Sequence, residues 1–296
     1  MDHVHAAPVR GGAAPAPAPL LVGAPAELTL GPAGFDRRTG SLHRLADLEL
    51  VDVRLGVWRA PIDNDLRSIH GRPLVDAWRA AGLDRLCHKL REVRVDAEEL
   101  VVRTRAAAAG VDFALATEYR WSADADQVWL TVAVTPEGAW PCPLPRLGLA
   151  LTLPGAGPDT EVAWFGLGPG EAYRDTADAA RVGRYRSSVR DLQTPYVLPQ
   201  ENGNRRHVRE ARILPAAGPG LLLTGAPWFD LTARPWTTAA LDAATHTVDL
   251  RPDGHLHLQL DADHHGIGSA ACGPLLPAPH TLAAVPTTLT IGMTPC

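Results

Sequence analysis

The dominant feature of the sequence is a succession of short strand-like segments separated by turns rich in glycine and proline. The clearest segment runs from His255 to Asp261, where Leu256, Leu258 and Leu260 alternate with polar residues. Because successive side chains of a strand point to opposite faces, this alternation predicts a strand with one apolar face. The same reasoning predicts further strands at residues 26–30, 113–121, 127–135, 146–153, 161–167, 206–214, 221–224 and 287–293.

Helical patterning is confined to two places. Pro73 opens a segment with helical spacing over residues 74–86, and a weaker pattern covers residues 237–245. The 27 glycines and 27 prolines supply turn residues throughout the chain. Many strands with few helices predict an all-β fold, a large antiparallel β-sandwich. They argue against a barrel of alternating strands and helices.

Composition narrows the class of protein further. The net charge of −5 is mild and no block of Lys and Arg occurs, which argues against nucleic acid as a partner. The four cysteines are widely separated, which favours thiols in a reducing cytoplasm over a zinc site or a disulfide scaffold. No apolar run reaches the roughly 18 residues of a membrane span, and no signal peptide is recognised. We therefore expect a cytoplasmic protein without a membrane partner.

The chain divides into two parts of unequal length. Residues 1–24 consist mainly of Ala, Pro and Gly and resemble an interdomain linker. Residues 25–296 carry the strand patterns, so we expect them to form the folded domain.

Carboxylates suited to glycoside hydrolysis are not evident. A retaining glycosidase needs two carboxyl groups about 5–5.5 Å apart across the scissile bond. Glu98 and Glu99 are adjacent, and neighbours on a strand point to opposite faces. We therefore expect no catalytic residue in this chain.

Two other patterns suggest ligands but are incomplete. His255 and His257 share a strand face, as a metal site could use, but no third ligand follows at a standard spacing. Gly166–Gly170 lacks the Lys-Ser/Thr pair of a phosphate-binding loop. No metal site is predicted. Tryptophan can stack on a sugar ring but more often packs in the core, and both interpretations stay open for Trp58, Trp140, Trp164, Trp228 and Trp236.

Four segments stand out by their order and spacing: Trp58–Asp65, Trp164–Asp175, Thr194–Arg205 and His265–Pro274. Together they resemble the C-terminal domain of family 2 β-galactosidases, the lactose-hydrolysing enzymes, and the resemblance covers roughly residues 25–296. In some bacteria a similar segment is a separate small chain paired with a large catalytic chain.

The resemblance implies a β-supersandwich of the galactose mutarotase type. In the family this domain contributes to the mouth of an active site that lies in the central barrel. Asp63, Asn64 and Asp65 precede a segment that resembles a mobile flap at the entrance. His265 and Gly266 begin a loop that resembles one reaching into the pocket. For all of these residues, loop architecture is favoured over direct contact with a ligand.

The sequence departs from the family at the end of the second loop. In many members that loop ends in a tryptophan that stacks on the sugar. Here Cys272 and Gly273, followed by Pro274, take its place, and the loop is one residue shorter. A thiol offers no comparable apolar face, so the sugar contact is expected to be weaker or supplied elsewhere.

The resemblance leads to one main hypothesis and two alternatives. The main hypothesis is a small subunit or C-terminal domain that docks on a barrel-bearing β-galactosidase partner, contacts carbohydrate and supports oligomer contacts. The family's catalytic glutamates and its divalent and monovalent cations belong to the barrel, so no cofactor is expected in this chain. The alternatives are a stand-alone carbohydrate-binding or mutarotase-like module, with His255, His257 and Gln259 lining a groove, and a truncated remnant.

Overall fold

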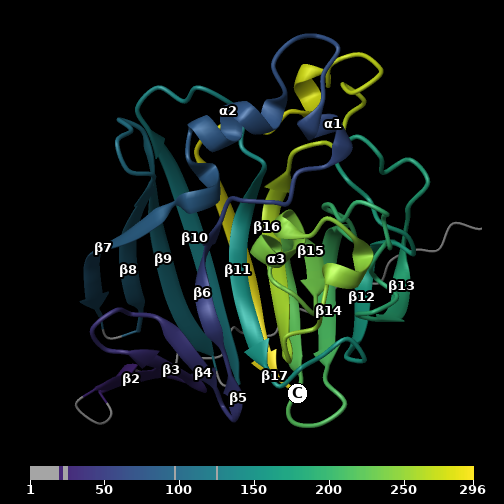
Figure 1. The fold of residues 1–296 in the computed structure, drawn as a ribbon. Coiled ribbons are helices and arrows are strands. Elements are labelled where there is room, and N and C mark those ends of the chain that lie inside the picture. The colour runs from purple at the N-terminus through teal and green to yellow at the C-terminus, as the bar shows by residue number, and fades with distance from the viewer. Residues whose placement is uncertain (1–19, 23–25, 97, 125) are drawn as a thin grey trace, which may run out of the picture.

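A computed structural model describes residues 20–22, 26–96, 98–124 and 126–296. Its strands form two antiparallel sheets. The smaller sheet has five strands in sequence order and lies at the lower end of the molecule in Figure 1. These strands are β1 (Leu20–Val22), β2 (Glu27–Leu30), β3 (Ala33–Asp36), β4 (Leu42–Leu45) and β5 (Leu48–Glu49).

The larger sheet has twelve strands, all paired antiparallel. Most of them show an alternation of buried and less buried residues, as expected for strands with one face on a core. They are β6 (Val51–Gly56), β7 (Cys87–Val95), β8 (Leu100–Ala107), β9 (Ala114–Asp124), β10 (Gln127–Glu137), β11 (Arg146–Pro154), β12 (Glu161–Gly168), β13 (Arg181–Ser188), β14 (Arg205–Leu214), β15 (Leu221–Arg234), β16 (His255–His264) and β17 (Thr287–Pro295).

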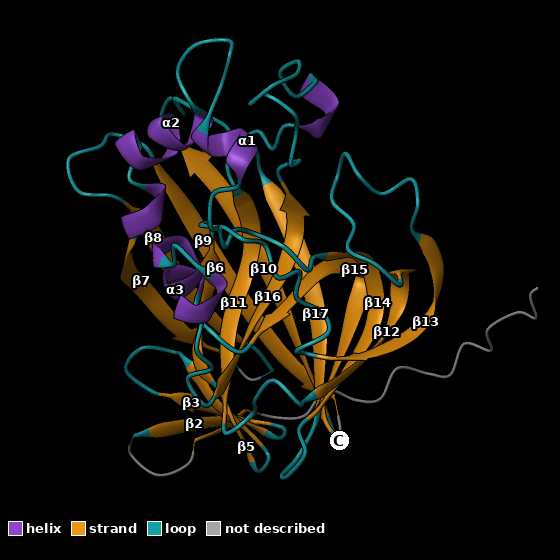
Figure 2. Cartoon of the chain, turned by 45° about the vertical axis from the view of Figure 1, so that its right-hand side comes forward, coloured by secondary structure: helices purple, strands orange, loops and turns teal. Residues whose placement is uncertain are grey.

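Strand β15 divides this sheet into two layers (Figures 1 and 2). Residues 221–225 pair with β17, whereas residues 230–234 pair with β16. One layer continues from β17 to β10, β9, β8 and β7, in that order. The other layer continues from β16 to β11 and β6. The layers face each other, since the Tyr119 hydroxyl of β9 accepts a hydrogen bond from the Leu55 amide of β6 at 2.8 Å. Leucines of β11 and β16 fill the space between them together with apolar residues of β10 and β17.

Short helices gather at one end of the sandwich and over one face. Helices α1 (Asp63–Leu66) and α2 (Leu74–Ala80) lie at the top in Figure 1, followed by a 3-10 turn, η1 (Leu83–Arg85). Helix α3 (Thr238–Ala243) lies in front of the sheet in both ribbon views. The remaining 3-10 turns are η2 (Thr247–Asp249) and η3 (Ala278–His280). In the part of the chain that the structure describes, no helix has the length and apolar character needed to cross a bilayer.

The all-β prediction is confirmed, and each of the nine predicted strands corresponds to a strand of the structure. Some boundaries differ. The predicted helix over 74–86 ends at Ala80, because Gly82 adopts a left-handed φ of 70° that breaks it into η1. Strand β15 continues ten residues beyond the predicted end at Thr224. The predicted linker at residues 1–24 lies outside the described residues, apart from strand β1.

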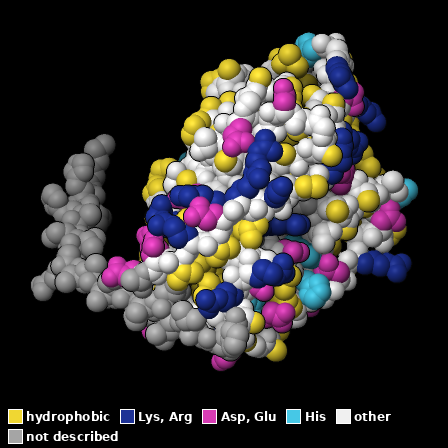
Figure 3. Space-filling model, turned by 90° about the vertical axis from the view of Figure 1, so that its left-hand side faces the viewer, with side chains coloured by type: hydrophobic (Ala, Val, Ile, Leu, Met, Phe, Trp, Pro, Cys, Tyr) yellow, Lys and Arg dark blue, Asp and Glu magenta, His cyan; other side chains and the backbone are white. Residues whose placement is uncertain are grey.

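The outer face of β7–β10 carries charges of both signs, as the space-filling view shows (Figure 3). Arg103 of β8 pairs with Glu92 and Glu118 at 2.6 and 2.7 Å. Arg120 of β9 pairs with Glu99 and Glu118, both at 2.7 Å. Positive and negative side chains therefore pair across neighbouring strands of this face.

Candidate functional site

Four segments far apart in sequence come together beside α1. The backbone N–H of Asp63 donates to the side-chain oxygen of Gln200 at 3.1 Å. The side-chain amide of Asn64 donates to the backbone carbonyl of Gly268 at 2.6 Å. The Gly203 amide donates to the Glu171 carboxylate at 2.6 Å. These segments are the four that carry the family resemblance, so the fold joins them into one continuous loop region.

The start of α1 is fixed by a buried ion pair. One terminal nitrogen of Arg59 contacts both carboxylate oxygens of Asp65 at 2.8 Å, and Asp65 also accepts from the Ile62 amide at 3.0 Å. Arg59 stacks over the Trp78 ring at 5.2 Å. Burial raises the pKa of the Asp65 carboxyl, and the Arg59 guanidinium opposes that rise. The sequence predicted a loop at Asp63–Asp65, and the structure shows a single helical turn held by this pair.

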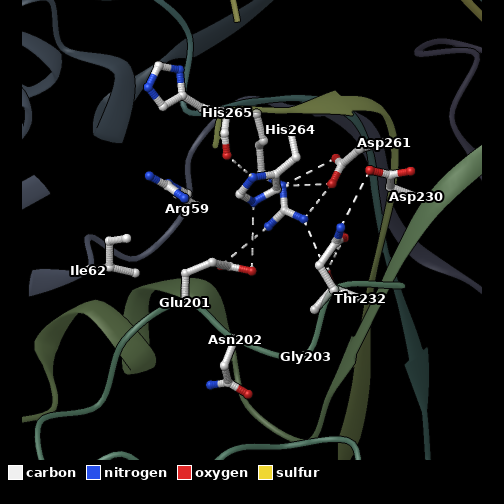
Figure 4. Close-up of polar contacts among 12 residues, drawn as sticks. Arg59, Ile62, Glu201, Asn202, Gly203, Asp230, Thr232, Asp261, His264 and His265 are labelled. Atoms are coloured by element: carbon white, nitrogen blue, oxygen red, sulfur yellow. Dashed lines mark hydrogen bonds and ion pairs between the residues drawn. The ribbon is translucent and has the colours of Figure 1, made fainter. Parts of the chain in front are cut away.

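Below this turn, further charged residues meet in the interior (Figure 4). The Glu201 carboxylate accepts a hydrogen bond from the Arg234 guanidinium at 2.5 Å, and it lies 3.7 Å from the Arg146 guanidinium. The Arg146 guanidinium donates to the Asp261 carboxylate at 2.5 Å. Burial alone lowers the pKa of the Arg146 guanidinium, but the Asp261 and Glu201 carboxylates outweigh it and raise that pKa. We call the following six residues the buried charge cluster, with no member more than 3% exposed: Arg59, Asp65, Arg146, Glu201, Arg234 and Asp261.

Two neutral histidines border the buried charge cluster. The Nδ1 atom of His264 lies 2.7 Å from the His265 carbonyl, to which it donates, and its Nε2 atom lies 3.9 Å from Glu201. The Nδ1 atom of His265 accepts from the Leu282 amide at 3.1 Å. Burial and the nearby Arg59 lower the pKa of His265 to about 3, and they lower the pKa of His264 well below its usual value. His265 thereby ties its loop to the segment before β17.

Several buried polar atoms here have no hydrogen-bond partner among the described residues. They include donors on Arg59 and Arg146 and acceptors on Glu201 and His264. Because the residues themselves are enclosed, they cannot contact a substrate from solvent. The buried charge cluster contains three arginines and three carboxylates, so its formal charges cancel. Its ion pairs hold the adjoining loops in one arrangement.

The residues predicted to lie at the active-site mouth differ in how deeply they are buried. Asp63 is exposed and Asn64 is half-buried, whereas Asp65, His265 and Gly266 are buried. In the second loop Cys272 is exposed and Gly273 is half-buried.

The segment after α1 and the second loop are joined directly. The His70 ring lies 2.7 Å from the Gly273 carbonyl, and the Ile69 amide donates to the Ala270 carbonyl at 3.3 Å. Between them lies a cavity of about 300 Å³, lined mainly by apolar groups such as Leu74, Ile267 and Leu276. The structure therefore brings the two predicted mouth segments together around a shared hollow.

The other candidates of the sequence lie elsewhere. Glu99 pairs with Arg120, and Glu98 is exposed beside it. His257 contacts Thr152 and Asp253 at 3.1 and 2.9 Å. Among the residues that the structure describes, no group of three or more His, Cys, Asp or Glu is placed to hold a metal ion.

The five candidate tryptophans also differ in exposure. Trp228 is 40% exposed, where β15 bends between the two layers, and Trp164 is buried. Trp58, Trp140 and Trp236 are half-buried. Trp164 lies within β12, and Trp228 lies within β15.

Sequence analysis missed most of the buried charge cluster. Arg146 was assigned only to a strand, and Asp261 to a polar strand face. A signal that these two residues are buried was nevertheless present in the sequence. Arg146 directly precedes a run of strand-forming apolar residues that begins at Leu147, and Asp261 directly follows one that ends at Leu260. Arg234 follows the predicted end of its strand, and nothing in the local pattern marks it.

Comparison with known proteins identifies the family. The family model described as beta galactosidase small chain matches residues 32–293. The chain belongs to this family. Curated relatives agree, since a β-galactosidase of Arthrobacter sp. (strain B7) is 36% identical over 88% of this chain and 27% of its own length. A β-galactosidase of Vibrio cholerae is 35% identical over 79% of this chain and 23% of its own length.

The small-chain domain thus spans about a quarter of the length of these curated relatives. Among solved structures, a galactose mutarotase-like protein from Lactobacillus casei is similar over 94% of this chain and 100% of its own, with 11% identity and a TM-score of 0.47.

Proposed function

We propose that this small-chain domain completes a β-galactosidase by docking on a barrel-bearing catalytic partner and forming one wall of its active-site entrance. The catalytic carboxylates belong to the partner in this proposal. The substrate class is the β-galactosides, such as lactose, that the relatives' name implies. The chain's own contribution is a rigid end of a sandwich that presents two joined loops.

The observation that carries the proposal is the pairing of segment 63–72 with loop 265–274. Both are anchored from below, by the Arg59–Asp65 pair and by the His265–Leu282 bond. A large apolar side chain is exposed at each of them: Ile69 within the segment is 67% exposed, and Leu275, directly after the loop, is 60% exposed. Exposed apolar residues around a hollow are typical of a surface that another protein covers.

The sequence departure at Cys272 gives the proposal a specific form. Cys272 is exposed and Gly273 carries no side chain, so the tip of the loop offers little apolar area to a sugar ring. We infer that the loop shapes the entrance through its backbone, together with the adjoining Leu275, while stacking on the sugar is left to the partner.

Reconstitution tests the proposal. The full chain is assayed for hydrolysis of a nitrophenyl β-galactoside, alone and after coexpression with the Arthrobacter β-galactosidase truncated before its matching segment. We expect activity only in the coexpressed sample. Enzyme-like hydrolysis by the chain alone, or a partner that assembles with the chain and stays inactive, would contradict the proposal.

A matched pair of variants locates the docking face. Ile69→Asp and Leu275→Asp should each reduce assembly, because a charge would be buried against the partner. Val95→Asp is the control, since Val95 is 42% exposed on β7, away from the loops. Equal assembly by all three variants would place the docking face elsewhere.

A further inference from the structure

Strand β13 is an edge of the large sheet, at the right-hand side of Figure 1, and among the described residues it pairs with β12 alone. The ladder that joins β13 to β12 contains eight consecutive residue pairs and no register shift. The ladders of the other two edge strands, β6 with β11 and β7 with β8, each contain a register shift. Because a bulge bends a strand and interrupts its edge, β13 is the one of these three edges that remains regular enough to pair with a further strand.

The backbone groups of β13 that point away from β12 can be located from a neighbouring hydrogen bond. The Val189 N–H, one residue beyond the strand, donates to the carbonyl of Thr160, the residue before β12, at 2.9 Å. Backbone groups alternate in direction along an antiparallel strand, so those of Val182, Arg184 and Arg186 point to the open side. They form a row of donors and acceptors of the kind that binds an extended peptide by strand addition.

The side chains along this edge select the charge of the incoming strand. Strands β12, β13 and β14 contain seven arginines and two glutamates, whereas the whole chain has a net charge of −5. The side chains of Arg184 and Arg186 are 73% and 74% exposed, and they lie 3.6 and 3.5 Å from the carboxylates of Glu210 and Glu161. Both distances exceed the usual length of an N–H···O hydrogen bond, so these guanidinium groups can still bind carboxylates from another chain.

The same charges argue against a second copy of the chain as the occupant of this edge. Full-length antiparallel pairing of two β13 strands would bring Arg184 and Arg186 of one copy beside the same arginines of the other. Like charges on directly opposite residues are destabilising, and β13 contains no carboxylate that would compensate them. A strand with acidic residues would instead place a carboxylate beside each arginine.

Strand geometry also fixes the pattern of the incoming segment. Side chains alternate between the two faces of a sheet, so carboxylates that meet Arg184 and Arg186 must recur at every second residue. The residues between them lie on the face where Tyr185 packs on Trp164, with ring centroids 5.4 Å apart. That aromatic neighbour favours apolar side chains at the intervening positions.

We propose that the open edge of β13 binds an extended acidic peptide segment of another protein, with carboxylates beside Arg184 and Arg186 and apolar residues between them. The bound segment adds one strand to the large sheet. The site goes beyond the proposed function, because it uses neither the cavity beside α1 nor the two loops around it. Its failure would leave the docking proposal intact, and the reverse also holds.

Titration of the full chain with a synthetic peptide tests the proposal. A fluorescent eight-residue peptide of alternating Glu and Val, blocked at both ends, should bind with a Kd of about 0.1–1 mM by fluorescence anisotropy. Two further peptides carry N-methyl groups, one on the Glu amides and the other on the Val amides. Only one of these sets of amides faces β13, so one methylated peptide should lose binding and the other should keep it. Absence of saturable binding, or equal affinities of the two methylated peptides, would overturn the proposal.

Charge reversal on two edge strands separates this edge from general attraction between charges. The double variant Arg184→Glu and Arg186→Glu should weaken binding about tenfold or more, because each change replaces attraction by repulsion. The matched control is Arg91→Glu with Arg94→Glu on β7, the edge whose ladder contains a register shift, and it should leave the affinity unchanged. Equal losses in the two double variants, both folded by circular dichroism, would contradict the assignment to β13.

Sedimentation velocity tests the other occupant of the edge. The unmodified chain should not self-associate through β13, so adding the Glu-Val peptide should leave its sedimentation coefficient almost unchanged. A dimer that the peptide dissociates would assign this edge to a second copy of the chain and would overturn the proposal.

Discussion

The molecule contains two networks of Arg, Asp and Glu side chains in opposite surroundings. On the outer face of β8 and β9, Arg103 and Glu118 meet at 2.7 Å with side chains 46% and 25% exposed. In the buried charge cluster, Arg146 and Asp261 meet at 2.5 Å with side chains 0% exposed. The contact distances are similar, but water surrounds one network and is excluded from the other.

This difference decides what each network contributes. An exposed ion pair contributes little to the stability of the fold, because water solvates the two charged groups equally well when they are apart. A buried pair costs free energy to desolvate, and breaking it leaves a charge without a partner in a medium of low dielectric. The outer network therefore serves solubility, while the buried charge cluster specifies one arrangement of the loops it supports.

The largest expected effect is that of Glu201→Ala. The substitution leaves the guanidinium groups of Arg146 and Arg234 facing each other without the carboxylate between them. We expect a loss of about 3–5 kcal/mol in the free energy of unfolding, measured by urea denaturation. A loss below about 1 kcal/mol would show that the cluster behaves like the outer network.

We expect low pH to destabilise the fold through the neutral histidines. The folded-state pKa of His265, about 3, lies below its ordinary value of 6.5, so on acidification the unfolded chain takes up a proton that the folded chain does not. Stability from this group is present above pH 6.5 and is lost as pH falls toward 3. His265→Asn, which keeps an acceptor for the Leu282 amide, should lessen this loss by about 1.4 kcal/mol per pH unit. Thr281→Ala, next to Leu282, is the control, because it removes no titrating group and should leave the slope unchanged.

A smaller and local effect is expected at Asn64. Its side-chain amide donates to the carbonyls of Ile267 and Gly268, so Asn64→Ala should release loop 265–274 with a loss of about 1–2 kcal/mol. Hydrogen exchange of the loop amides measures this release, and Arg67→Ala, at an exposed neighbouring position, is the control. Unchanged exchange would mean that the loop is held by other contacts alone.

The smallest effect is expected at the outer network. Glu118→Ala removes the carboxylate that Arg103 and Arg120 share, yet its cost should be below about 1 kcal/mol. Added salt should shrink this cost further, whereas the cost of Glu201→Ala should hardly change. A comparable salt dependence at both sites would contradict the contrast between the two networks.

Nine of the seventeen strands that the structure describes were predicted from the sequence, because their signal is local. Alternation in His255–Asp261 follows directly from the geometry of a strand with one buried face, and the structure buries Leu256, Leu258 and Leu260. Strand β7 was missed because most of its residues are exposed and it lies at the edge of the sheet, where no buried face imposes a pattern. The single turn α1 was missed because four residues are too few for a helical period.

The candidate site was predicted only in part. Asp63–Asp65 and loop 265–274 were recognised as segments, but their contact depends on pairings across some 200 residues, such as Asn64 with Gly268. The partners within the buried charge cluster are likewise distant in sequence, since Arg146 and Asp261 are 115 residues apart. Such contacts arise from sheet topology, which local patterns do not encode.

The position of β17 has a consequence for the order in which the fold can form. Strand β17 lies between β10 and β15, so it joins β7–β10 to the rest of the large sheet. A ribosome releases residues 87–137 long before residues 287–295, and until then β10 has an unpaired edge. An unpaired edge can bind another strand, so the emerging chain remains open to wrong pairing until β17 inserts. Completion of the sheet therefore waits for a strand that is made long after β7–β10.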